Sequence, residues 1–205
     1  MERIARCVFG LALFGLGISL ILQAELGAAP WDVFHTGVSD ITGIPIGTVT
    51  IITGVLLLLL WIPLREQPGL GTILNAIEIG VLVDIILPIL PDVELLVIRT
   101  LMLFGGVLVI AVGSGFYIGA GLGPGPRDGL MTGLARHGFS IGRARTAIEL
   151  AVLAFGVALG GAIGIGTAVF AFGIGPLAHV LLPRLSMPPL APKSTTDSNP
   201  STISP

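Results

Sequence analysis

The residues best able to do chemistry lie in two short stretches that share one skeleton. The first is ELGAAPWDVFHTG at residues 25–37, and the second is AGLGPGPRDGLMTG at residues 120–133. In both, a proline is followed by a large side chain and then an aspartate: Trp31 and Asp32 in the first stretch, Arg127 and Asp128 in the second. Proline is favoured in the first turn of a helix, where a carboxylate also meets the positive end of the helix dipole. Each stretch therefore predicts the end of one helix and the start of another.

Helix starts of this kind are candidate solute sites. Transporters often bind substrate near the middle of the membrane, where a spanning helix is interrupted. A bare helix start attracts an anion, but Asp32 and Asp128 offset that charge, so a cation, a proton or a polar amine is an equal candidate. Arg127 restores positive charge in the second stretch alone. The alternatives are a dipole partner without a ligand for each aspartate, and an interfacial anchor for Trp31.

Other ionisable residues fall deep inside apolar stretches, where a charge costs several kcal/mol and is a functional candidate by default. Glu78 and Glu149 are candidate ion-coupling groups, with Asp84, Arg145 and His179 as secondary candidates. Because Arg145 lies four residues before Glu149, an intrahelical ion pair is the alternative for that carboxylate. For Glu78 the alternative is a buried, protonated carboxyl, and for Asp84 and His179 it is a position near the lipid headgroups.

Composition places the chain in a membrane. Of its 205 residues, 53% are hydrophobic and 11% charged, and the mean hydropathy is +1.00. A soluble domain carries about a quarter charged residues. Four stretches contain no Asp, Glu, Lys or Arg: 7–24, 41–64, 100–126 and 150–183. Since a spanning helix needs about 20 apolar residues, we expect a multi-pass protein whose principal partner is the lipid bilayer.

The same inventory argues against several function classes. A formal net charge of −2 gives no reason to expect a nucleic acid partner. The chain has no P-loop, no HExxH and no CxxC motif, and its three histidines do not cluster in the sequence. We therefore expect no metal, no cofactor and no enzyme activity.

The chain contains an internal repeat. A shift of 96 residues aligns Leu26 with Leu122 and Asp32 with Asp128, and a shift of 95 aligns Gly71-Thr72 with Gly166-Thr167. Such regular matches predict two copies of one unit. We place the first membrane repeat at 1–92 and the second at 93–183. The remainder, 184–205, is rich in Pro, Ser and Thr and is expected to be a disordered cytoplasmic tail.

Each repeat should contain three long helices and one short helix. The expected helices lie near 5–25, 30–41, 45–64 and 70–88 in the first repeat, and near 98–120, 126–137, 141–160 and 165–182 in the second. About 12 residues rise only about 18 Å, against about 30 Å of hydrocarbon, so the short helices should be re-entrant or interfacial. Three spans per repeat invert the second copy relative to the first.

The arginines give a further test of this topology. With both termini cytoplasmic, the inverted arrangement leaves only Arg99 on the outer side. The competing model has eight spans and parallel repeats, and it strands Arg65 and Arg127 outside in place of Arg99, which the positive-inside rule disfavours. The fold class we expect is therefore an all-α polytopic membrane protein with two inverted tandem repeats.

At PWDVFHTG, GPRDGLMTG, RTAIE and GIGT the chain resembles the bacterial YczE/YitT-like family of small multispanning membrane proteins, and most closely its YczE branch. The resemblance covers about residues 1–185. It implies a protein of the bacterial plasma membrane with about six spans, from a family without a settled biochemical activity.

Two functions fit these observations. The first is a small secondary transporter or exporter of an unknown solute or ion, with Trp31, Asp32, Arg127 and Asp128 along its path. The second is a non-transporting accessory or assembly protein for another membrane complex. A homodimer or a membrane-protein partner is compatible with either function.

Overall fold

The computed structural model describes residues 1–138 and 140–188. In these residues the chain forms helices joined by short connections, as predicted: α1 (Glu2–Ala24), α2 (Pro30–Thr42), α3 (Ile46–Leu64), α4 (Leu70–Ile86), the 3-10 helix η1 (Leu87–Ile89), α5 (Leu96–Gly119), α6 (Pro126–Arg136), α7 (Ile141–Ala158) and α8 (Ile165–Leu185). The all-α prediction is confirmed, and both short helices begin at the expected prolines. The predicted disordered tail falls largely outside the described residues.

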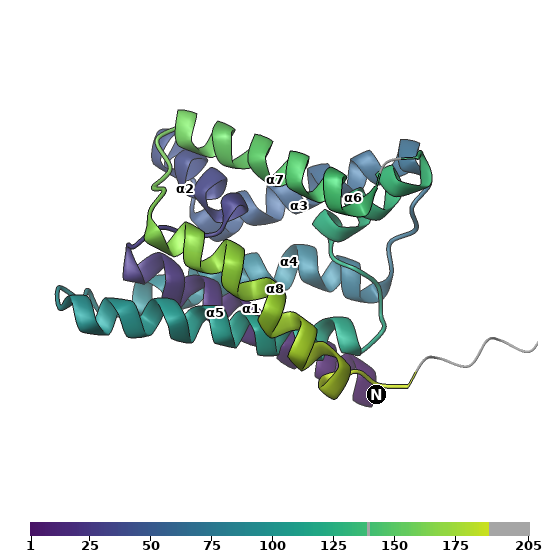
Figure 1. Ribbon diagram of the computed structural model, residues 1–205, viewed down its shortest axis with the longest axis horizontal. Coiled ribbons are helices and arrows are strands. Elements are labelled where there is room, and N and C mark those ends of the chain that lie inside the picture. Colours follow the sequence, from purple (N-terminus) through teal and green to yellow (C-terminus); the bar gives the residue numbers. More distant parts are fainter. Residues whose placement is uncertain (139, 189–205) are drawn as a thin grey trace, which may run out of the picture.

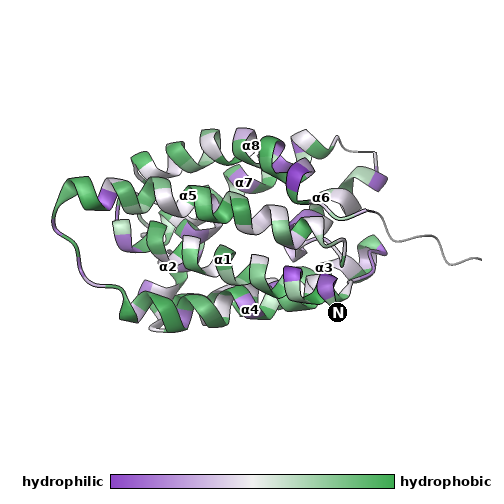
Figure 2. Cartoon of the chain, turned by 90° about the horizontal axis from the view of Figure 1, so that it is seen from below, coloured by the Kyte–Doolittle hydropathy of each residue, from purple (hydrophilic) through white to green (hydrophobic). Residues whose placement is uncertain are grey.

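Five of these helices are long and apolar enough to cross a membrane, namely α1, α3, α4 extended by η1, α5 and α8. This supports a multi-pass membrane protein, and Figure 2 shows apolar residues along most of the outer faces of these helices. Our prediction of six spans included α7, which is 18 residues long. Because α7 carries Arg143, Arg145 and Glu149, its composition falls short of that of the other five helices.

The long helices run roughly along one common direction (Figure 1). At the centre α1 packs along α5, with α4 against α1 and α8 against α5. The second group pairs α2 with α7 and α3 with α6. The N-terminus and the end of α8 lie at the same end of the molecule (Figure 1). The described core is therefore built around α1 and α5, with the short helices to one side.

Glycines allow α1 and α5 to approach closely. A Cβ added to Gly10 would lie 2.6 Å from the Gly113 carbonyl oxygen, and one added to Gly17 would lie 2.7 Å from that of Gly106. Small residues permit such backbone contact between membrane helices, where dispersion rather than water exclusion drives packing. Any larger side chain at these positions would push the central pair apart.

The connection before each short helix contains left-handed backbone: residues 25–29 between α1 and α2, here called the first break, and residues 120–125 between α5 and α6, called the second break. Glu25 and Gly27 have φ of 49° and 97° after α1, and Gly121 and Gly123 have φ of 67° and 120° after α5. Glycine adopts this region without steric cost, which explains the repeated Leu-Gly of the sequence. Glu25, the exception, is held by Arg99, whose Nε donates to the Ala24 carbonyl at 2.7 Å.

The breaks are also held from outside. The start of α8 binds the first break, where the Gly166 amide donates to the Leu26 carbonyl at 2.7 Å. The start of α4 binds the second break, where the Gly71 amide donates to the Leu122 carbonyl at 2.8 Å. These bonds satisfy carbonyls that the interrupted helices leave free. The short helices therefore start from fixed points.

Candidate functional site

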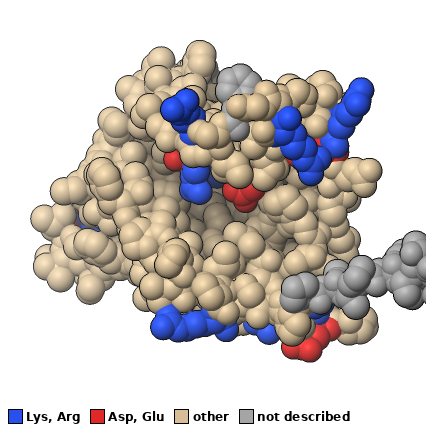
Figure 3. Space-filling view, turned by 45° about the vertical axis from the view of Figure 1, so that its right-hand side comes forward, with Lys and Arg blue, Asp and Glu red and all other residues tan. Residues whose placement is uncertain are grey.

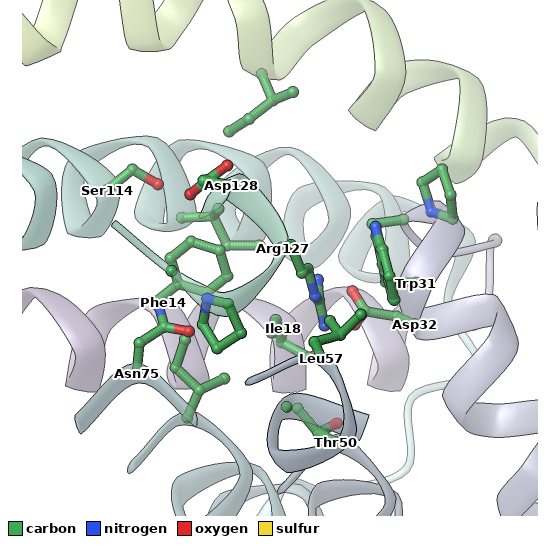
Figure 4. A pocket seen from close by; sticks show the side chains of 18 of the residues that line it. Phe14, Ile18, Trp31, Asp32, Thr50, Leu57, Asn75, Ser114, Arg127 and Asp128 are labelled. Carbon is green, nitrogen blue, oxygen red and sulfur yellow. The ribbon is translucent and has the colours of Figure 1, made fainter. Parts of the chain in front are cut away.

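A cavity of about 210 Å³ lies inside the bundle, and side chains from α1 to α8 line it. Its apolar wall includes Phe14, Ile18 and Leu57, and its polar wall includes residues of both short helices (Figure 4). Binding sites commonly combine an apolar lining with a few convergent polar groups. This cavity is therefore the candidate functional site.

The starts of α2 and α6 meet at the cavity. The Arg127 guanidinium stacks over the Trp31 ring, 4.8 Å from its centroid, which joins the two short helices directly. The Asp32 carboxylate is turned toward Arg127, and the Asp128 carboxylate is turned away from it (Figure 4). Asp32 is only 3% exposed, whereas Asp128 is exposed within the cavity. The four residues singled out by the repeated motif thus share one site.

Neither short helix carries a side-chain cap at its start. The N-cap residues Ala29 and Gly125 have no side-chain acceptor, so no N-cap side chain satisfies the first backbone N–H groups. Behind α6, the buried Trp61 indole donates to the Pro126 carbonyl at 3.0 Å. Gly129 makes this possible, because a Cβ there would lie 1.9 Å from the Trp61 ring.

Sequence reasoning did not assign His35 to the site. Its side chain is fully buried one turn after Asp32, with Nδ1 3.7 Å from the Asp32 carboxylate and 3.0 Å from the Thr50 hydroxyl. Thr50 itself lines the cavity. Nε2 of His35 has no hydrogen-bond partner among the described residues. The spacing of Asp32 and His35 at i and i+3 was the available signal, because such residues share a helix face.

The far end of the cavity is polar as well. Tyr117 lines it and is 2% exposed, and its hydroxyl has no hydrogen-bond partner in the described part of the chain. Asn75 and Ser114 lie at the same end, near Asp128 and away from Trp31 (Figure 4). The available sequence signals were a single tyrosine and an amide within an apolar stretch, but only tertiary packing brings Tyr117 and Asn75 together.

Glu149 and Arg145 also line the cavity, from α7. Arg145 Nε donates to Glu149 Oε1 at 3.0 Å, so the ion pair foreseen as the alternative for Glu149 is formed. The pair is partly exposed, with 55% of the Arg145 side chain and 32% of the Glu149 side chain accessible.

Three predicted site residues lie elsewhere. Asp84 accepts hydrogen bonds from the Gly47 amide at 2.6 Å and the Thr48 hydroxyl at 2.7 Å, so its carboxylate is occupied at the start of α3. His179 is exposed on α8, and Glu78 is half-buried on α4. None of the three is among the residues that line the cavity. The cavity does not bring them together with the residues of the short helices.

The cavity opens between α7 and α8. In the first half of the chain α3 packs along α4, but α7 and α8 hardly touch, although only residues 159–164 separate them in sequence. Figure 3 shows a hollow between two layers of the molecule, with charged side chains at its rim. Arg145 and Glu149 line the cavity from α7, and Phe170, Ile174 and Ala178 line it from α8.

Comparison with known proteins places this chain. Residues 1–183 match the model of a family of unknown function, DUF6198. An uncharacterised protein of Haemophilus influenzae is 35% identical over 93% of the chain and 88% of its own length. The uncharacterised membrane protein YczE of Bacillus subtilis is 34% identical over 89% of the chain and 88% of its own length. No solved structure matches the chain. The chain therefore belongs to the DUF6198 family and is a homologue of the membrane protein YczE.

Proposed function

We propose that the protein is a small secondary transporter that carries a polar or charged solute by alternating access. The observation that carries this proposal is the convergence of the α2 and α6 starts on a charged cavity among membrane-spanning helices. Ionisable groups at membrane depth are costly and commonly mark solute or ion paths. Interrupted helices that face such a site are typical of transporters built from repeats.

Paired contacts between α1 and α5 support an inverted repeat. Gly10 corresponds to Gly106 and Gly17 to Gly113 under the shift of 96. The close contacts join Gly10 to Gly113 and Gly17 to Gly106, so exchanging the two helices reproduces the same pairs. Contacts of this reciprocal kind are characteristic of a two-fold axis, and they require α1 and α5 to be antiparallel.

The bonds at the two breaks support the same axis. In the repeat alignment Gly71 corresponds to Gly166, and Leu26 corresponds to Leu122. The Gly71 amide donates to the Leu122 carbonyl, and the Gly166 amide donates to the Leu26 carbonyl. The two halves therefore exchange equivalent backbone bonds at 2.7 and 2.8 Å. Rocking of one half against the other about this axis would open the cavity to each side in turn.

We also propose that both termini are cytoplasmic. Basic residues gather at the end of the molecule that holds the N-terminus: Arg3, Arg6, Arg65, Arg136, Arg143 and Arg184. Arg99, at the opposite end, pairs with Glu25 at 3.2 Å. An excess of arginine on one side is the usual mark of the cytoplasmic face.

The test uses one cysteine in the cavity and needs no knowledge of the solute. Replacing the single native Cys7 by alanine and Ser114 by cysteine gives a protein labelled only from within the cavity. A membrane-impermeant maleimide is applied to intact cells and to inside-out vesicles. Alternating access predicts labelling of Ser114→Cys from both sides.

The wild-type protein is the control, because Cys7 is fully buried and should stay unlabelled. Labelling from one side only, under all conditions tested, would refute alternating access. That result would instead favour the accessory or assembly protein, for which a fixed cavity is sufficient.

A further inference from the structure

We propose that the cavity binds the primary ammonium group of an amphiphile, whose apolar chain passes between α7 and α8 into the bilayer. The inference rests on the proposed transport function and names its substrate class. It is carried by an unsatisfied polar cluster at one end of the cavity, by the charge balance of the lining and by the opening toward lipid.

The polar cluster consists of Asn75, Ser114, Tyr117 and Asp128. A Cβ added to Gly125 would lie 3.2 Å from the Tyr117 hydroxyl oxygen and 3.4 Å from both the nitrogen and the oxygen of the Asn75 side-chain amide. These groups therefore adjoin the start of α6. The Tyr117 hydroxyl is buried without a partner in the described chain. Burying a polar group without a partner is unfavourable, and a ligand can offset that cost by binding to it.

The charges favour a cation over an anion. The lining holds three carboxylates, Asp32, Asp128 and Glu149, and two guanidiniums. Arg145 is paired with Glu149 at 3.0 Å, and Arg127 faces Asp32. Neither Asp32 nor Asp128 has an arginine within 4.0 Å in the described part of the chain, so three carboxylates share two guanidiniums and the lining as a whole holds one carboxylate in excess. The start of α6 offsets only about half of that charge.

The number of acceptors matches an ammonium group. A primary ammonium has three N–H donors and no acceptor. The Tyr117 hydroxyl oxygen and the Asn75 carbonyl oxygen adjoin Gly125, and the Asp128 carboxylate lines the same end of the cavity, so this end supplies three acceptors. An anionic head in the same place would meet Asp128 and leave these oxygens unpaired.

The rest of the cavity suits an apolar chain. Phe170, Ile174 and Ala178 line it from α8, next to the opening. Outside the opening, Leu150 on α7 and Phe172 on α8 are 60% and 82% exposed, as expected of side chains in lipid. A hydrocarbon chain can therefore leave the cavity along the apolar side chains of α8, while the Arg145–Glu149 pair lies on the α7 side of the opening.

The experiment uses purified full-length protein in lipid nanodiscs and a long-chain primary amine with a diazirine in its chain. The N-acetylated amide with the same chain is the uncharged control. After illumination, cross-linked peptides are identified by mass spectrometry. We expect saturable labelling of α8 between residues 170 and 178. Labelling should be at least about tenfold stronger for the amine than for the amide, because the amine alone forms an ion pair, and a tenfold ratio corresponds to about 1.4 kcal/mol.

Two sets of variants probe the head and the chain. Asp128→Asn should lower amine labelling about tenfold and Tyr117→Phe about fivefold, whereas Asp40→Asn, an exposed carboxylate outside the cavity, should have no effect. Tyr117→Phe removes only an unpaired hydroxyl, so it should fold normally. Ala178→Trp should obstruct the opening and reduce labelling, whereas Phe172→Trp, which faces outward, should not.

Equal labelling by amine and amide, or amine labelling unchanged in both Asp128→Asn and Tyr117→Phe, would overturn the proposal. Labelling confined to the outer surfaces of the helices would do the same. These outcomes are distinct from those of the Ser114→Cys experiment. Two-sided access without amine binding leaves a transporter of another solute, and amine binding without two-sided access leaves a lipid site that does not transport.

Discussion

At the scale of single residues, Gly129 is where one added carbon would most directly disturb the site. Its missing side chain provides the space for Trp61, which is 1% exposed and bonded to the start of α6. Gly129→Ala should cost about 1–3 kcal/mol, because overpacking displaces a rigid ring. The midpoint temperature of thermal unfolding in detergent should fall by about 2–4 °C for each kcal/mol of lost stability. Gly105→Ala, with nothing within 4 Å of the added carbon, is the matched control and should unfold no earlier than wild type.

Replacing Asp84 should lower the stability of the protein strongly without changing access to the cavity. Its carboxylate accepts from the Gly47 amide and the Thr48 hydroxyl. Hydrogen bonds to a charged group contribute about 1.5–3 kcal/mol, so Asp84→Ala should clearly lower the unfolding temperature. Asp84→Asn keeps one acceptor and should lose less. Labelling of Ser114→Cys should be unchanged in both variants; a change would return Asp84 to the solute path.

The sequence identifies only part of the site at this scale. Trp31, Asp32, Arg127 and Asp128 could be selected because a repeated motif marks them. Tyr117, the single tyrosine of the chain, could not, because the sequence does not show whether its hydroxyl has a partner. What distinguishes it is an unpaired hydroxyl beside Gly125, and that depends on how α4, α5 and α6 pack.

At the scale of elements, the two breaks differ in how the neighbouring long helix, α8 or α4, is bonded to them. The Thr72 hydroxyl donates to the Pro124 carbonyl at 2.7 Å and accepts from the Gly69 amide at 3.1 Å. Its counterpart Thr167 accepts from the Gly164 amide at 3.3 Å, and makes no second bond within the described residues. The second break is therefore tied to α4 by a side chain, and the first break is tied to α8 by backbone alone.

Replacing these threonines by valine tests the side-chain hydrogen bond between Thr72 and the Pro124 carbonyl. Thr72→Val keeps the shape but removes both bonds, so it should cost about 1–3 kcal/mol because the Pro124 carbonyl loses its partner. Hydrogen exchange should rise in residues 119–126, and less so elsewhere. Thr167→Val should give a smaller change. Equal effects of the two variants on exchange would show that the side-chain bond to Pro124 contributes nothing.

The boundaries of the helices could be predicted from the sequence because the residues that mark them lie at the boundaries themselves. Pro30 and Pro126 mark helix starts, and Gly27 and Gly123 mark left-handed turns. The separation of α7 from α8 was not readable, since it depends on packing between helices. A repeat in the sequence suggests that α7 should lie along α8 as α3 lies along α4, and the structure departs from that expectation.

At the scale of the whole molecule, the topology decides the meaning of the cavity. In an inverted repeat the turn between α3 and α4 and the turn between α7 and α8 lie on opposite sides of the membrane. In a parallel repeat with eight spans they lie on the same side. Gln67 and Ala162 occupy equivalent exposed positions in these two turns, 95 residues apart. Each can be replaced by cysteine in the Cys7→Ala background.

The inverted arrangement predicts that Gln67→Cys reacts with an impermeant maleimide only in inside-out vesicles, and Ala162→Cys only in intact cells. The assignment of sides follows from the arginines near the N-terminus and the end of α8. Labelling of both positions from one side would exclude the two-fold axis, and alternating access about that axis with it. Reversal of both sides would keep the axis and turn the molecule over in the membrane. The two positions together therefore separate the fold of the repeat from its orientation.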